Sequence, residues 1–216
     1  MPIPISEQQP LILGSASPRR RELLSALGVS HLVRAVDVDE RPLPQEAAEG
    51  YVERIVGDKL AAVQRRVGAE GLAHAAIVVA DTTVVVDHEV LGKPVDVADA
   101  QRLLSRIAGR DHQVLTRYAI ALPDAGVCVA RTVSSQVTLR AATADELRRY
   151  AESGEGLDKA GAYAVQGLGA FLVRSISGSW SNVVGLPVCE LVEDLAALGI
   201  LGPFPAPVGG GGVRGL

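Results

Sequence analysis

Aromatic residues are scarce in this chain of 216 residues, since Phe, Trp and Tyr together make up only 3% of it. So few rings argue against a platform on which the bases of single-stranded nucleic acid would stack. Positive charge is not in excess either, because 21 Lys and Arg stand against 25 Asp and Glu, a net charge of −4. Affinity for a long polyanion comes mainly from neutralised phosphates, so we expect no nucleic-acid partner. A small anion can still bind where basic residues are concentrated.

Cysteines and long apolar runs are equally rare. Cys128 and Cys189 lie far apart and lack the spacing of a metal site, so we expect buried, reduced thiols. No apolar run is long enough to span a bilayer, and the first ten residues lack the basic and apolar segments of a signal peptide. The sequence therefore predicts a soluble cytoplasmic protein without a membrane partner.

Helix and strand patterns alternate along the chain, which predicts an α/β fold with a mixed central sheet flanked by helices. The stretch from Ala75 to Val86 is rich in valine and suggests a central pair of strands, interrupted at Asp81. The domain is expected to cover residues 1–201, followed by a flexible Gly/Pro-rich tail at 202–216 without chemistry of its own. Further strands are expected at 11–14, 31–38, 114–122, 127–139 and 170–176, and helices at 17–28, 45–67, 96–109, 143–154 and 187–198. Asp96 is a candidate cap for the third of these helices, and Thr143 with Glu146 fits a capping box at the start of the fourth.

The first candidate site is a run of small residues followed by two arginines, Gly14-Ser15-Ala16-Ser17-Pro18-Arg19-Arg20. Ser17 and Pro18 suit the start of a helix, whose free N–H groups attract an anion. Arg19 and Arg20 add forked donors that match phosphate oxygens. Cations at a helix N-terminus oppose its dipole, a cost that a bound anion would offset. A capped helix with solvated arginines explains the same residues equally well.

Two acidic positions are candidates for metal binding or proton transfer. Glu40 ends the cluster Asp37-Val38-Asp39-Glu40, which is able to hold Mg²⁺, although such loops are more often simply solvated. Asp81 lies within apolar strand sequence, where a carboxylate is costly to bury unless it is paired or ligated. A turn between two strands is the alternative, but the strand-like flanks favour a functional role for Asp81.

Two lysines and one glutamine complete the candidates. Lys59 lies on the apolar stripe of its helix, so it either extends to solvent, the commoner outcome, or reaches into a site. Lys93, in Leu91-Gly92-Lys93-Pro94, is in a tight loop and means little alone. Gln166 lies in a loop rich in glycine and alanine and is able to read a base by paired hydrogen bonds, unless this is only a surface loop. His112 is either structural or lines a cleft. The chain has neither a P-loop nor a nucleophile elbow.

Taken together, these motifs resemble the Maf family of nucleotide pyrophosphatases. They occur in family order over nearly all of the chain outside its ends, and an ordered set is far more specific than any one motif. The matching segments are Ser15-Ala16-Ser17-Pro18-Arg19-Arg20, Asp39-Glu40, Ala80-Asp81-Thr82, Leu91-Gly92-Lys93-Pro94, Gly109-Arg110-Asp111-His112 with Thr116, Lys159-Ala160-Gly161-Ala162-Tyr163-Ala164-Val165-Gln166-Gly167 and Ser181-Asn182-Val183-Val184-Gly185-Leu186-Pro187.

The resemblance implies a fold similar to that of inosine triphosphate pyrophosphatases, with two lobes around a cleft. It also implies a homodimer and a divalent cation, Mg²⁺ or Mn²⁺. The reaction would convert a nucleoside triphosphate into the monophosphate and pyrophosphate. The segment from Ala160 to Gly167 resembles the branch that acts on dTTP and UTP, and modified pyrimidine nucleotides are further candidate substrates. The Gly/Pro tail lies outside the family pattern.

The same resemblance suggests a role for each candidate. Glu40 and Asp81 would hold the metal, with Asp81 as general base, although their roles are interchangeable on the sequence alone. Arg19, Lys59 and Lys93 would neutralise phosphates, and Arg20 would either join them or brace the loop. Ser17 would cap its helix and bind an oxygen, and Gln166 would contact the base or sugar. The alternatives are a pyrophosphatase for 7-methyl-GTP or another modified nucleotide, and a non-catalytic nucleotide-binding regulator of cell division.

Overall fold

The computed structural model describes residues 2–123 and 125–205 and contains one mixed sheet. Its strand order is β2-β1-β3-β5-β6-β7, with β4 paired to β3 outside this path. β1 runs parallel to β2 and β3, whereas β3, β5, β6 and β7 are antiparallel neighbours. The strands are β1 (Leu11–Leu13), β2 (His31–Val33), β3 (Ala76–Val86), β4 (Glu89–Leu91), β5 (Asp111–Leu122), β6 (Gly126–Leu139) and β7 (Val173–Ser177). The predicted α/β class with a mixed sheet is confirmed.

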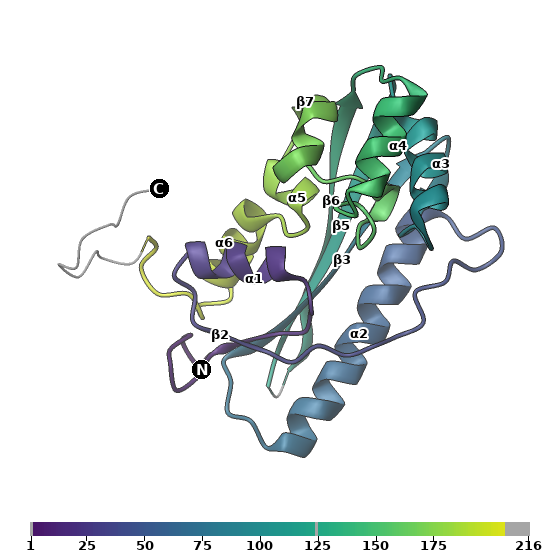
Figure 1. Cartoon of the computed structure of the whole chain (residues 1–216). Coiled ribbons are helices and arrows are strands. Elements are labelled where there is room, and N and C mark those ends of the chain that lie inside the picture. Colours follow the sequence, from purple (N-terminus) through teal and green to yellow (C-terminus); the bar gives the residue numbers. More distant parts are fainter. Residues whose placement is uncertain (1, 124, 206–216) are drawn as a thin grey trace.

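Helices cover both faces of the sheet and form two lobes (Figure 1). In the first lobe, α2 packs on one face of the sheet while α1 and α6 pack on the other. In the second lobe, α3 and α4 pack against the far halves of the long strands. The helices are α1 (Pro18–Ala26), α2 (Ala48–Glu70), α3 (Val97–Ile107), α4 (Ala144–Glu152), α5 (Trp180–Val184) and α6 (Val188–Ala197), with short 3-10 helices η1 (Ala160–Ala162) and η2 (Gly167–Leu172).

The alternation of side chains along β3 assigns its residues to the two lobe surfaces. Ile77 and Val79 pack under α2, whereas Val78 and Ala80 pack with α1 and α6. Asp81 continues the first series and so lies on the α2 face. Ala80 and Thr82, its neighbours in sequence, lie on the opposite face of the sheet, toward α1.

The expected strand pair at 75–86 is wrong, because β3 is one continuous strand through Asp81. Its register against β5 is unbroken from Ile77 to Val85, and Asp81 lies opposite Arg117. The β-branched threonines that follow Asp81 suit a strand as well as valine does. The charge of Asp81 does not force a turn, because Lys59 on α2 compensates it.

Other boundaries differ from the prediction where local signals were weak. Strand β2 ends at Val33, and η2 replaces the first residues of the strand expected at 170–176. Helix α2 begins at Ala48 and runs to Glu70. The five-residue helix α5 was not predicted. The capping box of Thr143 and Glu146 is confirmed.

Two further expectations meet different outcomes. The expected burial of the two cysteines is wrong, because Cys189 is exposed and Cys128 is partly exposed; both are free thiols. The flexible tail expected at 202–216 falls mostly on residues 206–216, which lie outside the described part of the chain. Among the described residues, no helix has the length and apolar character needed to cross a membrane.

Candidate active site in the cleft between the lobes

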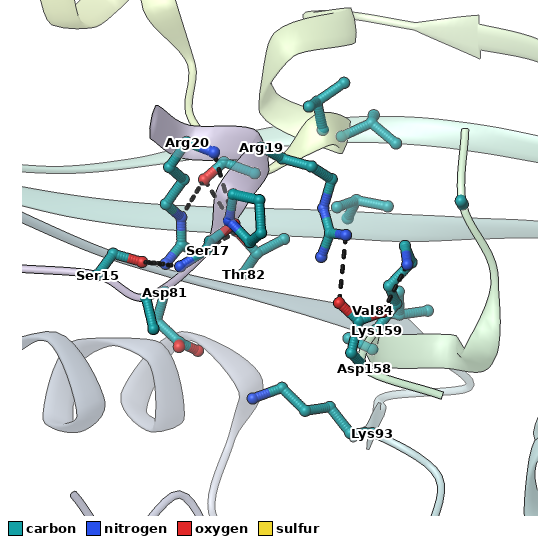
Figure 2. A pocket seen from close by; sticks show the side chains of 18 of the residues that line it. Ser15, Ser17, Arg19, Arg20, Asp81, Thr82, Val84, Lys93, Asp158 and Lys159 are labelled. Carbon is teal, nitrogen blue, oxygen red and sulfur yellow. Dashed lines mark hydrogen bonds and ion pairs between the residues drawn. The ribbon is translucent and has the colours of Figure 1, made fainter. Parts of the chain in front are cut away.

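A cleft of about 540 Å³ opens between the two lobes, and all the predicted site residues line it. Figure 2 shows part of this lining. The segment before α1 forms one wall, and the loop that follows α4 forms the opposite wall. The predicted residues in its lining are Ser17, Arg19, Arg20, Glu40, Lys59, Asp81, Lys93 and Gln166. Residues that are far apart in sequence therefore share one cavity.

Lys59 and Asp81 form a buried ion pair in the wall of this cleft. The Nζ of Lys59 lies 2.6 Å from Oδ1 of Asp81, and both residues are less than a tenth exposed. The apolar stripe of α2 aims Lys59 at the sheet, and the alternation along β3 aims Asp81 at α2. Lys59 therefore reaches into the cleft and does not extend to solvent.

Glu40 extends this pair into a chain of four alternating charges. Its Oε1 lies 2.6 Å from Nζ of Lys59, and its Oε2 accepts a hydrogen bond of 2.9 Å from Nζ of Lys93. Partial burial would raise the pKa of Glu40, but hydrogen bonds and charge from Lys59 and Lys93 outweigh it and lower the pKa to about 2. Glu40 is therefore ionised at neutral pH, and two carboxylates balance two ammonium groups.

The donor set of Glu40 and Asp81 is compatible with a divalent cation that arrives with phosphate. One oxygen from each carboxylate lies 2.6 Å from the same Lys59 nitrogen, so the two carboxyl groups lie close together with this ammonium group between them. Mg²⁺ is commonly held by one or two carboxylates together with substrate phosphates and waters. Over residues 2–123 and 125–205, no group of three or more His, Cys, Asp or Glu side chains forms a closed metal cage.

The two arginines of α1 have different surroundings. Arg20 is buried, and its guanidinium donates to the carbonyl of Gly185 at 2.7 Å, to the carbonyl of Ala80 at 2.8 Å and to Oγ of Ser15 at 2.9 Å. Burial lowers the pKa of Arg20, although the nearby Asp81 charge opposes that shift. Of the two roles considered for Arg20, its contacts are those of a brace.

Arg19 instead faces the open cleft. Its Nη1 lies 3.4 Å from Oδ2 of Asp158 on the opposite wall, and a quarter of its side chain is exposed. Figure 2 shows Arg19 reaching across the cleft while Arg20 turns back toward Ser15. Ser17 caps the helix, since its side chain accepts from the backbone N–H of Arg20. Arg19 is thus the arginine with donors accessible to a ligand.

A polar network lies beneath the cleft and includes Thr82, Thr116 and Asn182, which the sequence analysis named as motif residues without assigning them a role. Thr82 Oγ1 accepts from Arg20 at 3.0 Å and lies 2.9 Å from Oγ1 of Thr116. Thr116 donates to the carbonyl of Asn182, whose amide in turn donates to Val114 and Ser135. The available signal was isolated polar residues within otherwise apolar strands, because such residues need partners when buried.

The far wall of the cleft carries Gln166 and a buried His112–Tyr163 pair. Gln166 is exposed, and within the described residues its side chain makes no hydrogen bond. Tyr163 also lines the cleft, and its hydroxyl lies 2.8 Å from Nε2 of His112. Burial lowers the pKa of His112 to about 4, although the charge of Asp111 acts in the opposite direction. His112 is thus neutral at physiological pH and supports the wall from behind.

Comparison with known proteins identifies a single family. The model of the family described as Maf-like protein matches residues 10–198. A dTTP/UTP pyrophosphatase of Myxococcus xanthus is 48% identical over 202 residues, covering 93% of this chain and 98% of its own length. The proteins of the same name from Hahella chejuensis and Geobacter sulfurreducens are 44% and 42% identical, and cover 88% and 90% of this chain and 92% and 100% of their own lengths.

Proposed function

The chain belongs to the Maf family, and we propose that it hydrolyses dTTP and UTP at the α-phosphorus, releasing the monophosphate and pyrophosphate. The observation that carries the chemistry is the buried Lys59–Asp81 pair in the wall of the cleft. A carboxylate that lies beside a cation in a recessed site is suited to accept a proton from the water that attacks a phosphate. The choice of dTTP and UTP rests on the names of the relatives.

Each charged residue has a role in this reaction. Asp81 holds Lys59 through Oδ1 and is the group that accepts the proton of the attacking water. Lys59 and Lys93 neutralise phosphate oxygens as negative charge develops, and Arg19 does so from the opposite wall. Gln166 contacts the base. Ser17 caps α1 and directs the N–H groups of the helix toward the phosphates.

Glu40 and Asp81 would hold the divalent cation, Mg²⁺ or Mn²⁺. Such a cation neutralises the phosphates and polarises the bond that breaks. Glu40 is suited to this task because its pKa of about 2 keeps it ionised. Without the cation, Lys59 and Lys93 compensate the two carboxylates. A chelator is therefore expected to abolish turnover without lowering the melting temperature, in contrast to removal of a structural metal.

A nucleotide panel tests the proposed function. The purified chain is incubated with dTTP, UTP, CTP, GTP and 7-methyl-GTP in Mg²⁺ or in chelator, and pyrophosphate and phosphate are resolved. We expect pyrophosphate from dTTP and UTP only when Mg²⁺ is present. A diphosphate product would contradict attack at the α-phosphorus, and preferred hydrolysis of 7-methyl-GTP would contradict the pyrimidine choice. Tight binding without turnover of any nucleotide would instead identify a nucleotide-binding regulator.

The extent of the domain and its assembly are also part of the proposal. The cleft is lined entirely by residues between Gly14 and Gly185 among those described, so residues 1–201 are taken as the catalytic domain. Deleting 203–216 is expected to leave turnover and melting temperature nearly unchanged. The resemblance implies a homodimer, which sedimentation velocity at micromolar concentration tests.

A further inference from the structure

We propose that Glu155 is a positioning residue for base selection, because it anchors the loop on both sides of Gln166. The inference rests on the proposed function, since it takes Gln166 as the residue that contacts the base. Glu155 lies in the loop that follows α4, shortly after the last residue of that helix, Glu152. It lines the cleft. Its role is distinct from that of Glu40 and Asp81, as its contacts show.

Both oxygens of Glu155 are occupied by donors from the chain itself. Oε2 accepts from the backbone N–H of Gly169 at 2.7 Å and from the hydroxyl of Tyr150 at 2.9 Å. Oε1 accepts from the backbone N–H of Leu168 at 2.8 Å. A carboxylate with three such donors is neither a ready metal ligand nor a free base. It holds the chain on the C-terminal side of Gln166.

Tyr150 extends the same anchor to the other side of the glutamine. Its hydroxyl, which donates to Glu155, accepts from the backbone N–H of Ala164 at 3.0 Å. The segment from Ala164 to Gly169 is therefore tied at both ends to one carboxylate–phenol pair, with Gln166 between the ties. The side chain of Gln166 remains free to meet a ligand, whereas its backbone is not free to move.

The glycines of this segment show how closely the loop packs on its anchor. Gly167 has a φ of +68°, and a Cβ there would lie 2.3 Å from Oε1 of Glu155. A Cβ at Gly169 would lie 2.4 Å from the hydroxyl of Tyr150. A Cβ at Gly169 would also lie 2.4 Å from the carbonyl oxygen of Ala164, so neither position accepts a side chain without a shift of its neighbours, and the loop packs closely on Glu155 and Tyr150.

The charge of Glu155 is part of the anchor. Burial would raise the pKa of Glu155, but the N–H groups of Gly169 and Leu168 outweigh it and lower the pKa below its usual value. Hydrogen bonds to an ionised acceptor are roughly twice as strong as neutral ones. In Glu155→Gln, one acceptor oxygen becomes an NH₂ donor that faces another donor, whichever way the amide is turned. The substitution therefore loosens the loop while preserving the size of the side chain.

The expected kinetic effect is on substrate binding and on the choice of nucleobase rather than on kcat. For Glu155→Gln we expect the KM for UTP to rise roughly tenfold, with kcat within about threefold of the wild type. The preference for UTP over GTP in kcat/KM should narrow by a similar factor. Glu152→Gln is the matched control, because this exposed carboxylate pairs with Arg148 on α4 and makes no hydrogen bond to the loop within the described residues. It is expected to leave both parameters unchanged.

A double-mutant cycle with Gln166→Ala tests whether Glu155 acts through Gln166. If it does, adding Glu155→Gln to Gln166→Ala should change the KM by less than about twofold, because the contact is already lost. Calorimetry with a non-hydrolysable UTP analogue should give the same pattern in affinity. Penalties that multiply across the two substitutions would overturn the inference, as would a loss confined to kcat.

Two further arms keep the test decisive. If Glu155→Gln fails to fold, Tyr150→Phe replaces it in the cycle, since it removes only the hydroxyl that links Ala164 to Glu155. The cycle uses whichever nucleotide the wild type hydrolyses best. Inactivity of the wild type on dTTP and UTP therefore contradicts the proposed function alone. Penalties in KM that multiply across the two substitutions in an active enzyme contradict the role of Glu155 alone.

Discussion

At the scale of single residues, the site depends on how buried charges are compensated. A carboxylate within a strand is costly to bury alone, and Asp81 avoids that cost through Lys59 at 2.6 Å. Lys59 in turn has a second partner in Glu40, which is itself shared with Lys93. Altering any one of these four groups leaves a neighbour with excess charge. Substitutions here therefore affect stability as well as catalysis, and the two effects have to be measured separately.

Asp81→Asn should separate them. Asparagine keeps the shape of the side chain but removes the charge and nearly all basicity, so we expect kcat to fall on the order of a hundredfold or more. The unfolding free energy should fall by about 1–3 kcal/mol rather than rise, because Lys59 loses an ionic partner. Asp58→Asn is the control, since Asp58 is the exposed neighbour of Lys59 on α2. Near-normal turnover in a folded Asp81→Asn protein would make Glu40 the base.

Arg19 and Arg20 are adjacent, yet the same substitution should affect stability at Arg20 and nucleotide binding at Arg19. Arg20→Gln leaves several buried acceptors without donors and should lower the unfolding free energy by roughly 3 kcal/mol, or about 6–12 °C in melting temperature. Arg19→Gln should leave the melting temperature within about 2 °C and raise the KM for UTP several-fold. Thermal unfolding and steady-state kinetics on both variants decide it. A stable Arg20→Gln protein with weak nucleotide binding would give Arg20 the phosphate role.

At the scale of elements, prediction from sequence succeeded where the signal is local. The Ser17 cap, the Asp96 cap and the Thr143 capping box each mark a helix start that the structure has. It failed at β3, where a polar residue in an apolar run was taken for a break. The partner that removes the break is 22 residues away on α2, and no local rule identifies it. Helix α5 was missed because five residues carry too little periodicity to detect.

The fit between α2 and the sheet can be tested at Gly14. A Cβ there would lie 2.7 Å from both Val63 of α2 and Val79 of β3, so Gly14→Ala requires the packing between the helix and the sheet to shift. We expect a loss of about 1–3 kcal/mol in unfolding free energy. Turnover should fall as well, because Val63 is one helical turn from Lys59. Urea unfolding and kinetics on one preparation measure both effects.

Gly57→Ala supplies the matched comparison on the same helix. Gly57 is exposed within α2, and a Cβ there would meet nothing within 4 Å. Alanine should therefore stabilise the helix by up to about 1 kcal/mol and leave turnover unchanged. Equal losses in the two variants would show that the effect of Gly14→Ala is not a matter of helix–sheet contact.

At the scale of the whole molecule, the site exists because the sheet is mixed. Parallel pairing of β1 with β3 brings the segment before α1 beside Asp81, and the antiparallel strands carry the second lobe to the opposite wall. Composition and pattern predicted the α/β class and the mixed sheet. The order of the strands and the face that α2 covers were not predictable, because they depend on pairings between distant segments. The motifs predicted a set of residues that the structure brings to one cleft, whereas the choice between the two roles of Arg20 and the contacts of Glu155 required coordinates.

The stability of the whole molecule should fall in mild acid because of His112. Burial lowers its folded pKa to about 4, whereas an unfolded histidine titrates near 6.5. Between these values the unfolded chain binds a proton that the folded chain does not. Stability from this group is therefore full above about pH 6.5, falls as the pH drops toward 4, and levels off below that. The size of the effect is about 3 kcal/mol for a difference of roughly 2.5 pH units.

Urea unfolding at several pH values between 7.5 and 4.5 measures this slope. His112→Gln, which keeps a hydrogen-bonding group beside Tyr163, should remove most of it, whereas His88→Gln at an exposed turn should not. Glu40 acts in the same direction but at lower pH, since its folded pKa of about 2 lies below the usual 4.5 and its contribution is lost between those values. The two groups are therefore separable by pH. An unchanged slope in His112→Gln would mean that the acid sensitivity arises from carboxylates and that the His112–Tyr163 pair does not set it.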